Sequence, residues 1–438
     1  MRRVGKKFAH TRILHYRLLV LHPAVGGEAF MSTAACWRDM GHGAWLPRAA
    51  RPAAFPTYDY SQWPRMQPGN PPFRSPDEPA VLEYRQRHNC SGGSWSPQCH
   101  TSADRFVFRL HSQHGGRHSL IDPSSGTFRR AFCDMARKRE ITSVSYIGDS
   151  ILLHQYLSLL HLLGLEQPRL GGDGRACWSC LNKMSVVNCT ATADVGNDQA
   201  RALPITLRLW RCDRLDETAR AEVVLPTLRK ARSLTVLSVG AHYSPTKHRE
   251  YNHSLELAWR DFVSHLRALA DAIANETAHA RAQPRSLSKL QRRGGRGAVS
   301  TTAAASIIVW RTSPMGHPGC AADHLYRHPA PPEHILAPPV LSNPLTEWLQ
   351  CDECSGDFGW QQMPAMDELS TQSLEPLGVR TLDVTLMTRQ RPDSHTAFCW
   401  RKATDPTTRW PPDCLHYALP GVPDWWNAAM LSALNECE

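Results

Sequence analysis

The chain has 438 residues, of which 42% are hydrophobic and 21% charged, a balance typical of globular proteins that excludes a mostly disordered one. The formal net charge is +10, but much of it lies in the first twenty residues and between Arg281 and Arg296. The periodic segments carry neither a basic face with interleaved aromatic residues nor a recognisable nucleic-acid-binding module. We therefore expect no nucleic-acid partner.

The N-terminal segment, residues 1–35, is basic and contains a short apolar run broken by His15 and Arg17. This pattern favours a degraded signal-anchor over a membrane span, which needs about 20 unbroken apolar residues. Residues 36–140 form a cysteine-rich region with a proline-rich arm. The main domain is predicted over residues 141–438, with a flexible insertion at 281–305 that is rich in Arg, Ser, Gly and Ala.

Fourteen cysteines are spread along the chain, which favours disulfides over the tight double pairs of a zinc module. Disulfides persist in the secretory pathway, and four Asn-x-Ser/Thr sequons, at Asn89, Asn188, Asn252 and Asn275, point to the same compartment. Structural zinc is the alternative for two Cys-x-x-Cys pairs, Cys177 with Cys180 and Cys351 with Cys354. We expect no metal in the functional site.

Short apolar runs predict buried strands over residues 143–147, 234–239, 306–310 and 379–386. Helical periodicity occurs over residues 152–163, 255–273 and 425–434. This alternation predicts an α/β fold with a central parallel sheet flanked by helices. Functional groups of such sheets collect at the carboxyl ends of the strands, and each predicted strand leads into a polar motif there.

Gly148-Asp149-Ser150 follows the first predicted strand and precedes a predicted helix. A hydroxyl at a helix N-terminus lies where free N–H groups and the helix dipole favour an oxyanion. Gly148 permits a tight turn and Asp149 can hold the loop through its side chain. Ser150 can supply its Oγ as a nucleophile and its N–H as an oxyanion donor, with a simple helix cap as the alternative.

Asp413 and His416 form an Asp-x-x-His pair near the other end of the chain. On a turn, Asp413 can reach the Nδ1–H of His416 and leave Nε2 to take a proton from a serine. Asp393 and His395 are a rival pair, because residues two apart on an extended segment share a face. We prefer the later pair, since a helical turn stacks residues three apart closely.

Other polar residues follow the second and third predicted strands. Gly240 and His242 follow the second, and His242 can donate a hydrogen bond to an oxyanion or to substrate, with structural packing as its alternative. Arg311 and His317 follow the third. An arginine at a strand end binds a substrate carboxylate or sulfate, or holds a loop through an ion pair.

The block at residues 413–427, Asp-Cys-Leu-His-Tyr-Ala-Leu-Pro-Gly-Val-Pro-Asp-Trp-Trp-Asn, resembles the closing block of the trichome-birefringence-like family, within the PC-esterase branch of the GDSL/SGNH superfamily. Further motifs occur in the family's order: Gly148-Asp149-Ser150 with Gln155, Gly240 with His242, Arg311 with His317, and Asp393 with His395. Leu153 and His154 depart from the Arg-Asn that plant members usually carry.

The resemblance implies an SGNH-hydrolase-like fold with a cysteine-rich N-terminal extension and disulfide-bonded cysteines. It implies Ser150 as the nucleophile, His416 as the base and Asp413 as the orienting carboxylate. It places Gly148, Asp149, Gln155, Gly240, His242, Arg311 and His317 among the oxyanion- or substrate-binding candidates. It also implies O-acetyl transfer onto cell-wall polysaccharides in the Golgi lumen.

We therefore predict a polysaccharide O-acetyltransferase with a serine acyl-enzyme, no bound cofactor, and an acetyl donor such as acetyl-CoA as co-substrate. Association with a membrane, as a type II anchor, is expected through the N-terminus. A carbohydrate acetyl esterase with the same site is a second hypothesis, because water can resolve the acyl-enzyme. A non-catalytic glycan-binding protein is the third, with tryptophans as sugar platforms: Trp360, Trp400, Trp425 and Trp426.

Overall fold

The computed structural model describes residues 28–47, 106–110, 120–123, 125–165, 181–189, 202–282, 306–314, 316, 362–391, 415–417, 419 and 421–437. The helices are α1 (Glu28–Asp39), α4 (Phe128–Lys138), α5 (Ser150–Leu162), α6 (Glu217–Ala219), α7 (Leu225–Leu228), α8 (Leu255–Ala282), α12 (Met363–Leu374), α13 (Thr385–Arg389) and α14 (Val422–Glu436). Short turns of other helical types are η4 (Arg220–Val224), η5 (Arg249–Tyr251) and η9 (Glu375–Leu377).

A six-stranded sheet with the order β4-β5-β3-β6-β7-β8 forms the centre of the molecule. Its strands are β3 (Ser143–Gly148), β4 (Leu181–Cys189), β5 (Leu203–Arg211), β6 (Ser233–Ser238), β7 (Ile307–Arg311) and β8 (Arg380–Leu382). All neighbouring pairs are parallel except β4 with β5, which is antiparallel. The predicted α/β class is confirmed, with an antiparallel strand at one edge of an otherwise parallel sheet.

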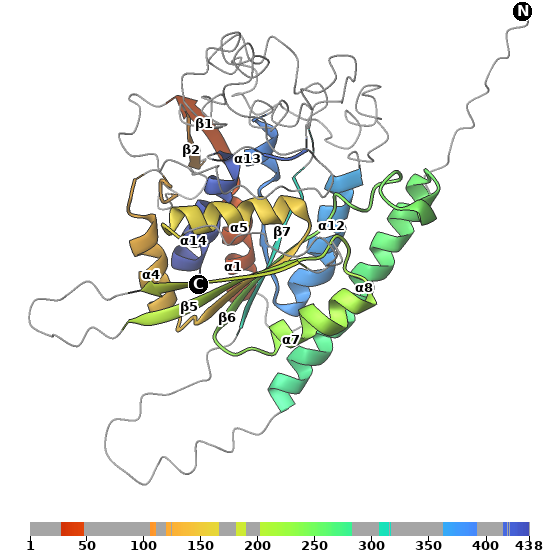
Figure 1. The fold of residues 1–438 in the computed structure, drawn as a ribbon, viewed down its shortest axis with the longest axis horizontal. Coiled ribbons are helices and arrows are strands. Elements are labelled where there is room, and N and C mark those ends of the chain that lie inside the picture. The colour runs from red at the N-terminus through yellow and green to blue at the C-terminus, as the bar shows by residue number, and fades with distance from the viewer. Residues whose placement is uncertain are drawn as a thin grey trace, which may run out of the picture.

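Helices cover both faces of this sheet (Figure 1). Successive strand side chains point to opposite faces, so Tyr146 of β3 packs into one hydrophobic cluster and its neighbour Ile147 into the other. The first cluster includes residues of α4, α5 and α14, and the second includes residues of α7, α8 and α12. On α8, buried side chains recur at helical spacing: Ala258, Phe262, Leu266, Leu269 and Ile273.

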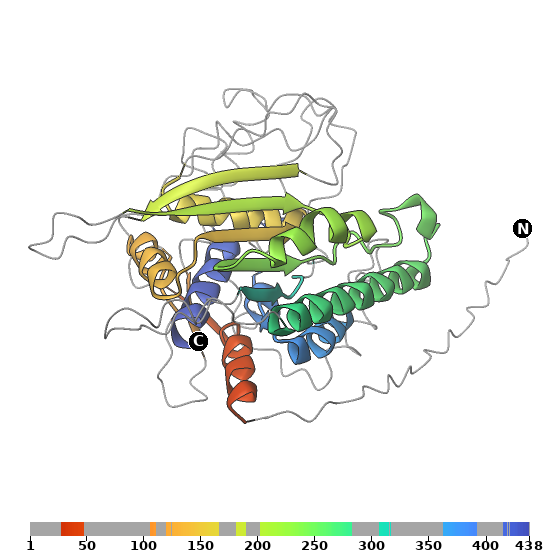
Figure 2. The ribbon, with the colours of Figure 1, turned by 90° about the horizontal axis from the view of Figure 1, so that it is seen from below.

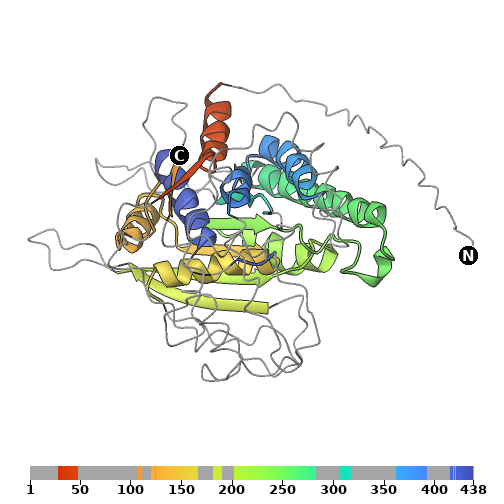
Figure 3. The same cartoon turned by 90° about the horizontal axis from the view of Figure 1, so that it is seen from above.

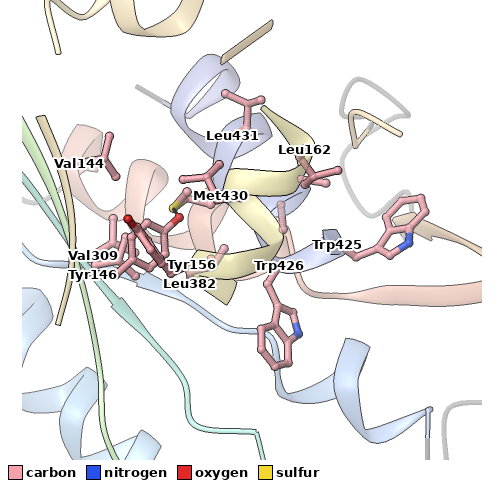
Figure 4. Packing of buried hydrophobic residues seen from close by; sticks show 14 of the residues in the cluster. Val144, Tyr146, Tyr156, Leu162, Val309, Leu382, Trp425, Trp426, Met430 and Leu431 are labelled. Carbon is pink, nitrogen blue, oxygen red and sulfur yellow. Dashed lines mark hydrogen bonds between the residues drawn. The ribbon is translucent and has the colours of Figure 1, made fainter. Parts of the chain in front are cut away.

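The core between β3, α5 and α14 holds the two ends of the folded domain together. In Figure 4, Tyr146 and Val309 of the sheet lie near Tyr156 of α5, with Met430 of α14 beside them. Trp426 of α14 belongs to the same hydrophobic cluster. Almost every residue of α5 and α14 is buried, as expected for helices packed on several sides. Helix α5 begins at Ser150 and α14 follows His416, so this packing fixes both segments on one scaffold.

The N-terminal region packs onto the same domain. Helix α1 lies beside the C-terminus in Figures 2 and 3, and a disulfide joins its Cys36 to Cys437. A small antiparallel sheet of β1 (Gly43–Pro47) and β2 (Phe106–Leu110) follows, and Trp45 of β1 belongs to the core around α5 and α14. A second disulfide, Cys133 to Cys189, joins α4 to the edge strand β4. The predicted disulfides are confirmed at these two pairs.

The strand predicted over residues 379–386 is wrong in its second half. Strand β8 ends at Leu382, and α13 begins at Thr385. The carboxylate of Asp383 accepts a hydrogen bond from the Thr385 N–H at 2.9 Å, which favours a helix start over a continued strand. No helix in the described residues is long and apolar enough to span a membrane.

Candidate active site

Helix α5 begins at Ser150, directly after β3 ends at Gly148. Asp149 is the N-cap, and its Oδ1 accepts a hydrogen bond from the Ile151 N–H at 3.0 Å. Its Oδ2 accepts hydrogen bonds from the N–H groups of Gly240 and Ala241, both at 3.2 Å. One buried carboxylate thus ties the turn that carries Ser150 to the loop that follows β6.

The Oγ of Ser150 lies 2.7 Å from the Nε2 of His416, within hydrogen-bond reach. The two residues are 266 positions apart, and only the packing of the C-terminal segment against α5 brings them together. Ser150 is 6% exposed, and His416 is partly exposed. A hydroxyl that can give its proton to an imidazole, at the first residue of a helix, has the geometry of an activated serine nucleophile.

Buried polar bonds hold the segment after His416 in place. Asp424 accepts hydrogen bonds from the Gly421 N–H at 2.8 Å and from the Ser158 hydroxyl of α5 at 2.5 Å. The side-chain amide of Asn427 donates to the Gln155 carbonyl of α5 at 2.9 Å, and its oxygen accepts from the Tyr146 hydroxyl at 3.0 Å. The Asp and Asn of the closing block therefore anchor α14 to α5 and β3.

Two glycines of the predicted site allow close packing of the backbone. A Cβ on Gly148 would lie 1.9 Å from the carbonyl oxygen of Ser238, and one on Gly240 would lie 2.5 Å from the Ser313 hydroxyl. A larger residue at position 148 would require the end of β6 to move, and one at position 240 would require the Ser313 side chain to move. The N–H of Gly240 already donates to Asp149. Gly148 and Gly240 thus bring the strand ends of β3, β6 and β7 close together.

His242 lies at the same carboxyl edge of the sheet, on the side of β5. Its Nε2 is 3.3 Å from the Oδ1 of Asp213, which also accepts a hydrogen bond from the Arg211 Nε at 3.2 Å. Burial lowers the pKa of His242 to about 4, and the carboxylates of Asp213 and Asp149 oppose this shift. The imidazole is therefore neutral near pH 7. Its one N–H faces the Asp213 carboxylate, which leaves the other ring nitrogen as a hydrogen-bond acceptor beside the serine turn.

Arg311, at the end of β7, is completely buried. Its Nη1 donates to the Thr312 carbonyl at 3.2 Å, and its guanidinium lies 4.8 Å from the centre of the Trp426 ring. Burial lowers the pKa of Arg311 to about 10, an effect that the nearby carboxylates of Asp149 and Asp367 oppose. This placement favours the structural alternative for Arg311, because a fully buried side chain does not reach a substrate.

The side-chain amide of Gln155 is buried on the first turns of α5, and its nitrogen and oxygen have no hydrogen-bond partner in the described part of the chain. Among the tryptophans considered as sugar platforms, Trp425 and Trp426 are 2% and 0% exposed. These two tryptophans are core residues, so that part of the glycan-binding hypothesis is wrong. Trp360 and Trp400 lie outside the described residues.

Several predicted residues lie outside the described ranges and stay predictions. They are Asp413, His317, the rival pair Asp393 and His395, and the four cysteines of the possible zinc site, Cys177, Cys180, Cys351 and Cys354. Most of the insertion at 281–305 also lies outside, although α8 runs to Ala282.

The sequence did not reveal one polar residue close to the candidate site, Asp213, and it marked another, His154, only as a departure from the family pattern. Asp213 contacts His242 and follows β5, a strand that the apolar runs did not reveal. His154 lies one helical turn after Ser150, and its ring centre is 5.2 Å from that of His416. The spacing of His154 four residues after the serine was the available signal, because residues four apart share a helix face.

A serine hydroxyl bonded to a histidine, at the carboxyl edge of an α/β sheet and the start of a helix, is the arrangement of serine-dependent hydrolases and acyltransferases. Residues 349–433 match the family model PC-Esterase, described as the GDSL/SGNH-like acyl-esterase family found in Pmr5 and Cas1p. The resemblance that the sequence indicated is therefore confirmed over the C-terminal part of the chain. The matched segment contains His416, and the contact between Oγ and Nε2 joins Ser150 to it.

The chain is also similar to two proteins of Arabidopsis thaliana. It is 34% identical over 92 residues to "Protein trichome birefringence-like 12", an alignment that covers 21% of this chain and 22% of the relative. It is 33% identical over 75 residues to "Protein trichome birefringence-like 15", with 16% of this chain and 15% of the relative covered. Each alignment thus spans about a fifth or less of the relative's length.

Proposed function

We propose that this protein is an acyltransferase that carries an acetyl group on Ser150 and passes it to a polysaccharide hydroxyl. The 2.7 Å contact between the Ser150 Oγ and the His416 Nε2 is the observation that carries the proposal. The match to an acyl-esterase family supports the ester chemistry, and the similarity to trichome-birefringence-like proteins supports the plant-polysaccharide context expected from the sequence.

In the first half-reaction, the Ser150 hydroxyl gives its proton to the His416 Nε2 as the Oγ attacks the acyl carbonyl carbon. The carbonyl oxygen becomes an oxyanion at the start of α5, where the N–H of Ser150 and the helix dipole stabilise negative charge. His416 then returns the proton to the leaving group as the bond to the donor breaks, which leaves Ser150 acylated. Asp413 is proposed to hold the Nδ1–H of His416 during these transfers.

In the second half-reaction, His416 takes a proton from an acceptor hydroxyl as its oxygen attacks the acyl carbon. His416 then gives this proton to the Ser150 Oγ as the acyl bond breaks, which restores the serine hydroxyl. A sugar hydroxyl gives transfer, and water gives hydrolysis. The esterase is the second candidate, because the matching family is described as acyl-esterases. The neutral His242 imidazole is proposed to bind an acceptor hydroxyl at the same edge of the sheet.

A secretory lumen is the proposed location, because disulfides such as Cys36–Cys437 and Cys133–Cys189 form in oxidising compartments. Asn252 lies exposed in a turn and fits a glycosylation acceptor there. Residence in the Golgi and anchoring through the N-terminus remain part of the same proposal.

The experiment incubates purified protein with a ¹⁴C-labelled acetyl donor, with acetyl-CoA as the first choice, and unacetylated xylan, and separately with acetylated xylan. A transferase labels the glycan, whereas an esterase releases acetate from acetylated xylan without labelling the acceptor. Ser150→Ala is the control, and it must abolish either activity. Glycan labelling by Ser150→Ala at the wild-type rate would overturn the proposal.

A further inference from the structure

Helix α5 carries a row of polar side chains at four-residue spacing, Ser150, His154 and Ser158, in a helix whose other buried residues are mostly apolar. Residues four apart share one helix face, so all three point toward the same neighbour. Each contacts the C-terminal segment: Ser150 contacts His416, His154 contacts Tyr417, and Ser158 contacts Asp424. The same helix therefore carries the nucleophile and holds the segment that supplies its base.

His154 is the central contact of this row and is completely buried. Its Nδ1 lies 2.7 Å from the backbone carbonyl oxygen of Tyr417, the residue after His416. A carbonyl oxygen only accepts hydrogen bonds, so Nδ1 carries the proton and donates it. The His154 ring also lies beside the His416 ring, with centres 5.2 Å apart and planes inclined by 35°. His154 thus holds both the backbone next to the base and one side of its ring.

We propose that His154 is a positioning residue that keeps the His416 Nε2 within reach of the Ser150 Oγ. The inference rests on the proposed function, since it concerns the same nucleophile and base. The contact matters because a displacement of about 1 Å between reacting groups can cost on the order of 100-fold in rate. His154 is 0% exposed, so its side chain does not contact a bound substrate.

A purely structural role for His154 makes a different prediction. If the ring only filled space, an apolar residue of similar size would replace it without loss of reactivity, because volume-conserving swaps in cores are tolerated best. If the hydrogen bond from the His154 Nδ1–H to the Tyr417 carbonyl positions the base, a replacement side chain preserves reactivity only when its donor lies where Nδ1 was. Asparagine can place an N–H near the Nδ1 position, whereas glutamine places it one bond further out, near Nε2.

The test uses a fluorophosphonate probe, which loses fluoride when a serine oxygen attacks phosphorus and so reports the reactivity of Ser150 without a known substrate. We expect His154→Asn to label within about threefold of wild type. We expect His154→Gln and His154→Leu to label at least about tenfold more slowly. In the two slower variants, the maximal labelling rate should fall while the half-saturating probe concentration stays unchanged, because His154 does not contact the probe.

His161→Asn, a histidine substitution further along α5, is the matched control and should label at the wild-type rate. Near-UV circular dichroism and urea midpoints identify the variants that fold. If His154→Gln or His154→Leu labels as fast as wild type, or if His154→Asn and His154→Gln label equally, the positioning role is overturned while the proposed function stands. If wild type is not labelled at Ser150, or Ser150→Ala is labelled equally, the proposed function itself fails.

Discussion

Replacing Asp149 with asparagine should destabilise the fold although it changes only one atom of the side chain. The two carboxylate oxygens accept three backbone hydrogen bonds, from Ile151 on one side and from Gly240 and Ala241 on the other. An asparagine amide can present its oxygen to only one side and turns its NH₂ toward N–H donors on the other. The better orientation keeps the oxygen toward Gly240 and Ala241 and gives up the N-cap bond to Ile151.

The lost N-cap costs about 1 kcal/mol. Each of the two remaining bonds changes from a charged to a neutral acceptor and loses about 1 kcal/mol, so the variant should be less stable by about 3 kcal/mol. This is a large share of a typical unfolding free energy of about 5–15 kcal/mol. The buried Arg311 guanidinium also loses a nearby negative charge, which makes the change more unfavourable.

Urea unfolding followed by tryptophan fluorescence measures this difference for Asp149→Asn. Asp134→Asn is the matched control, because Asp134 on α4 is 58% exposed and forms only a surface pair with Arg137. We expect the control to stay within about 0.5 kcal/mol of wild type. An unfolding free energy for Asp149→Asn within about 1 kcal/mol of wild type would refute the view that this carboxylate ties the two loops together.

Three further predictions concern packing, a disulfide and pH. Gly148→Ala should lower the urea midpoint and slow fluorophosphonate labelling, because the new Cβ would overlap the end of β6. Overpacking of this kind costs about 1–3 kcal/mol of stability. An unchanged urea midpoint and labelling rate would contradict this prediction. The double variant Cys133→Ser, Cys189→Ser opens a loop of sequence separation 56 and should lose about 4 kcal/mol in urea unfolding, and a loss below about 1 kcal/mol would argue against the link. Asp383 raises the pKa of His42, and His42 in turn helps to lower the pKa of Asp383. The pair therefore stabilises the fold fully between the unfolded carboxyl pKa of 3.8 and the unfolded histidine pKa of 6.5. This stabilisation is lost as the pH rises through the raised pKa of His42. His42→Gln should thus cost up to about 1 kcal/mol at pH 5.5 and less at pH 8.5 in thermal unfolding, whereas a larger cost at pH 8.5 would show that the sign is wrong.

The central strands were readable from the sequence because they are buried on both faces. Strand β7 begins with a continuous apolar run, and β3 and β6 combine apolar residues with small ones only, Ser, Thr and Gly, so all three can be buried between helices. Strand β5 lies next to the edge strand, and its residues alternate between buried and more exposed positions. Ile205, Leu207 and Leu209 are buried, and the residues between them are partly exposed. Apolar runs alone therefore missed β5 and β4, and with them Asp213, which follows β5.

The residues of the candidate site that belong to short local motifs could be predicted from the sequence. Gly148-Asp149-Ser150 indicated the helix start, and the closing block indicated His416, which lies 2.7 Å from the serine. The contacts that hold these residues are long-range and leave no local pattern. Asp149 bonds to a loop about 90 residues away, and His154 bonds to a carbonyl 263 positions away.

The most direct test of the central claim is to locate the covalent adduct. Purified protein is treated with a fluorophosphonate, digested, and sequenced by tandem mass spectrometry, with Ser150→Ala and His416→Ala treated in parallel. The proposed mechanism predicts one dominant adduct on Ser150 in wild type, none in Ser150→Ala, and labelling slowed by at least about 100-fold in His416→Ala. An adduct on another serine, or unchanged labelling of Ser150 without His416, would contradict it.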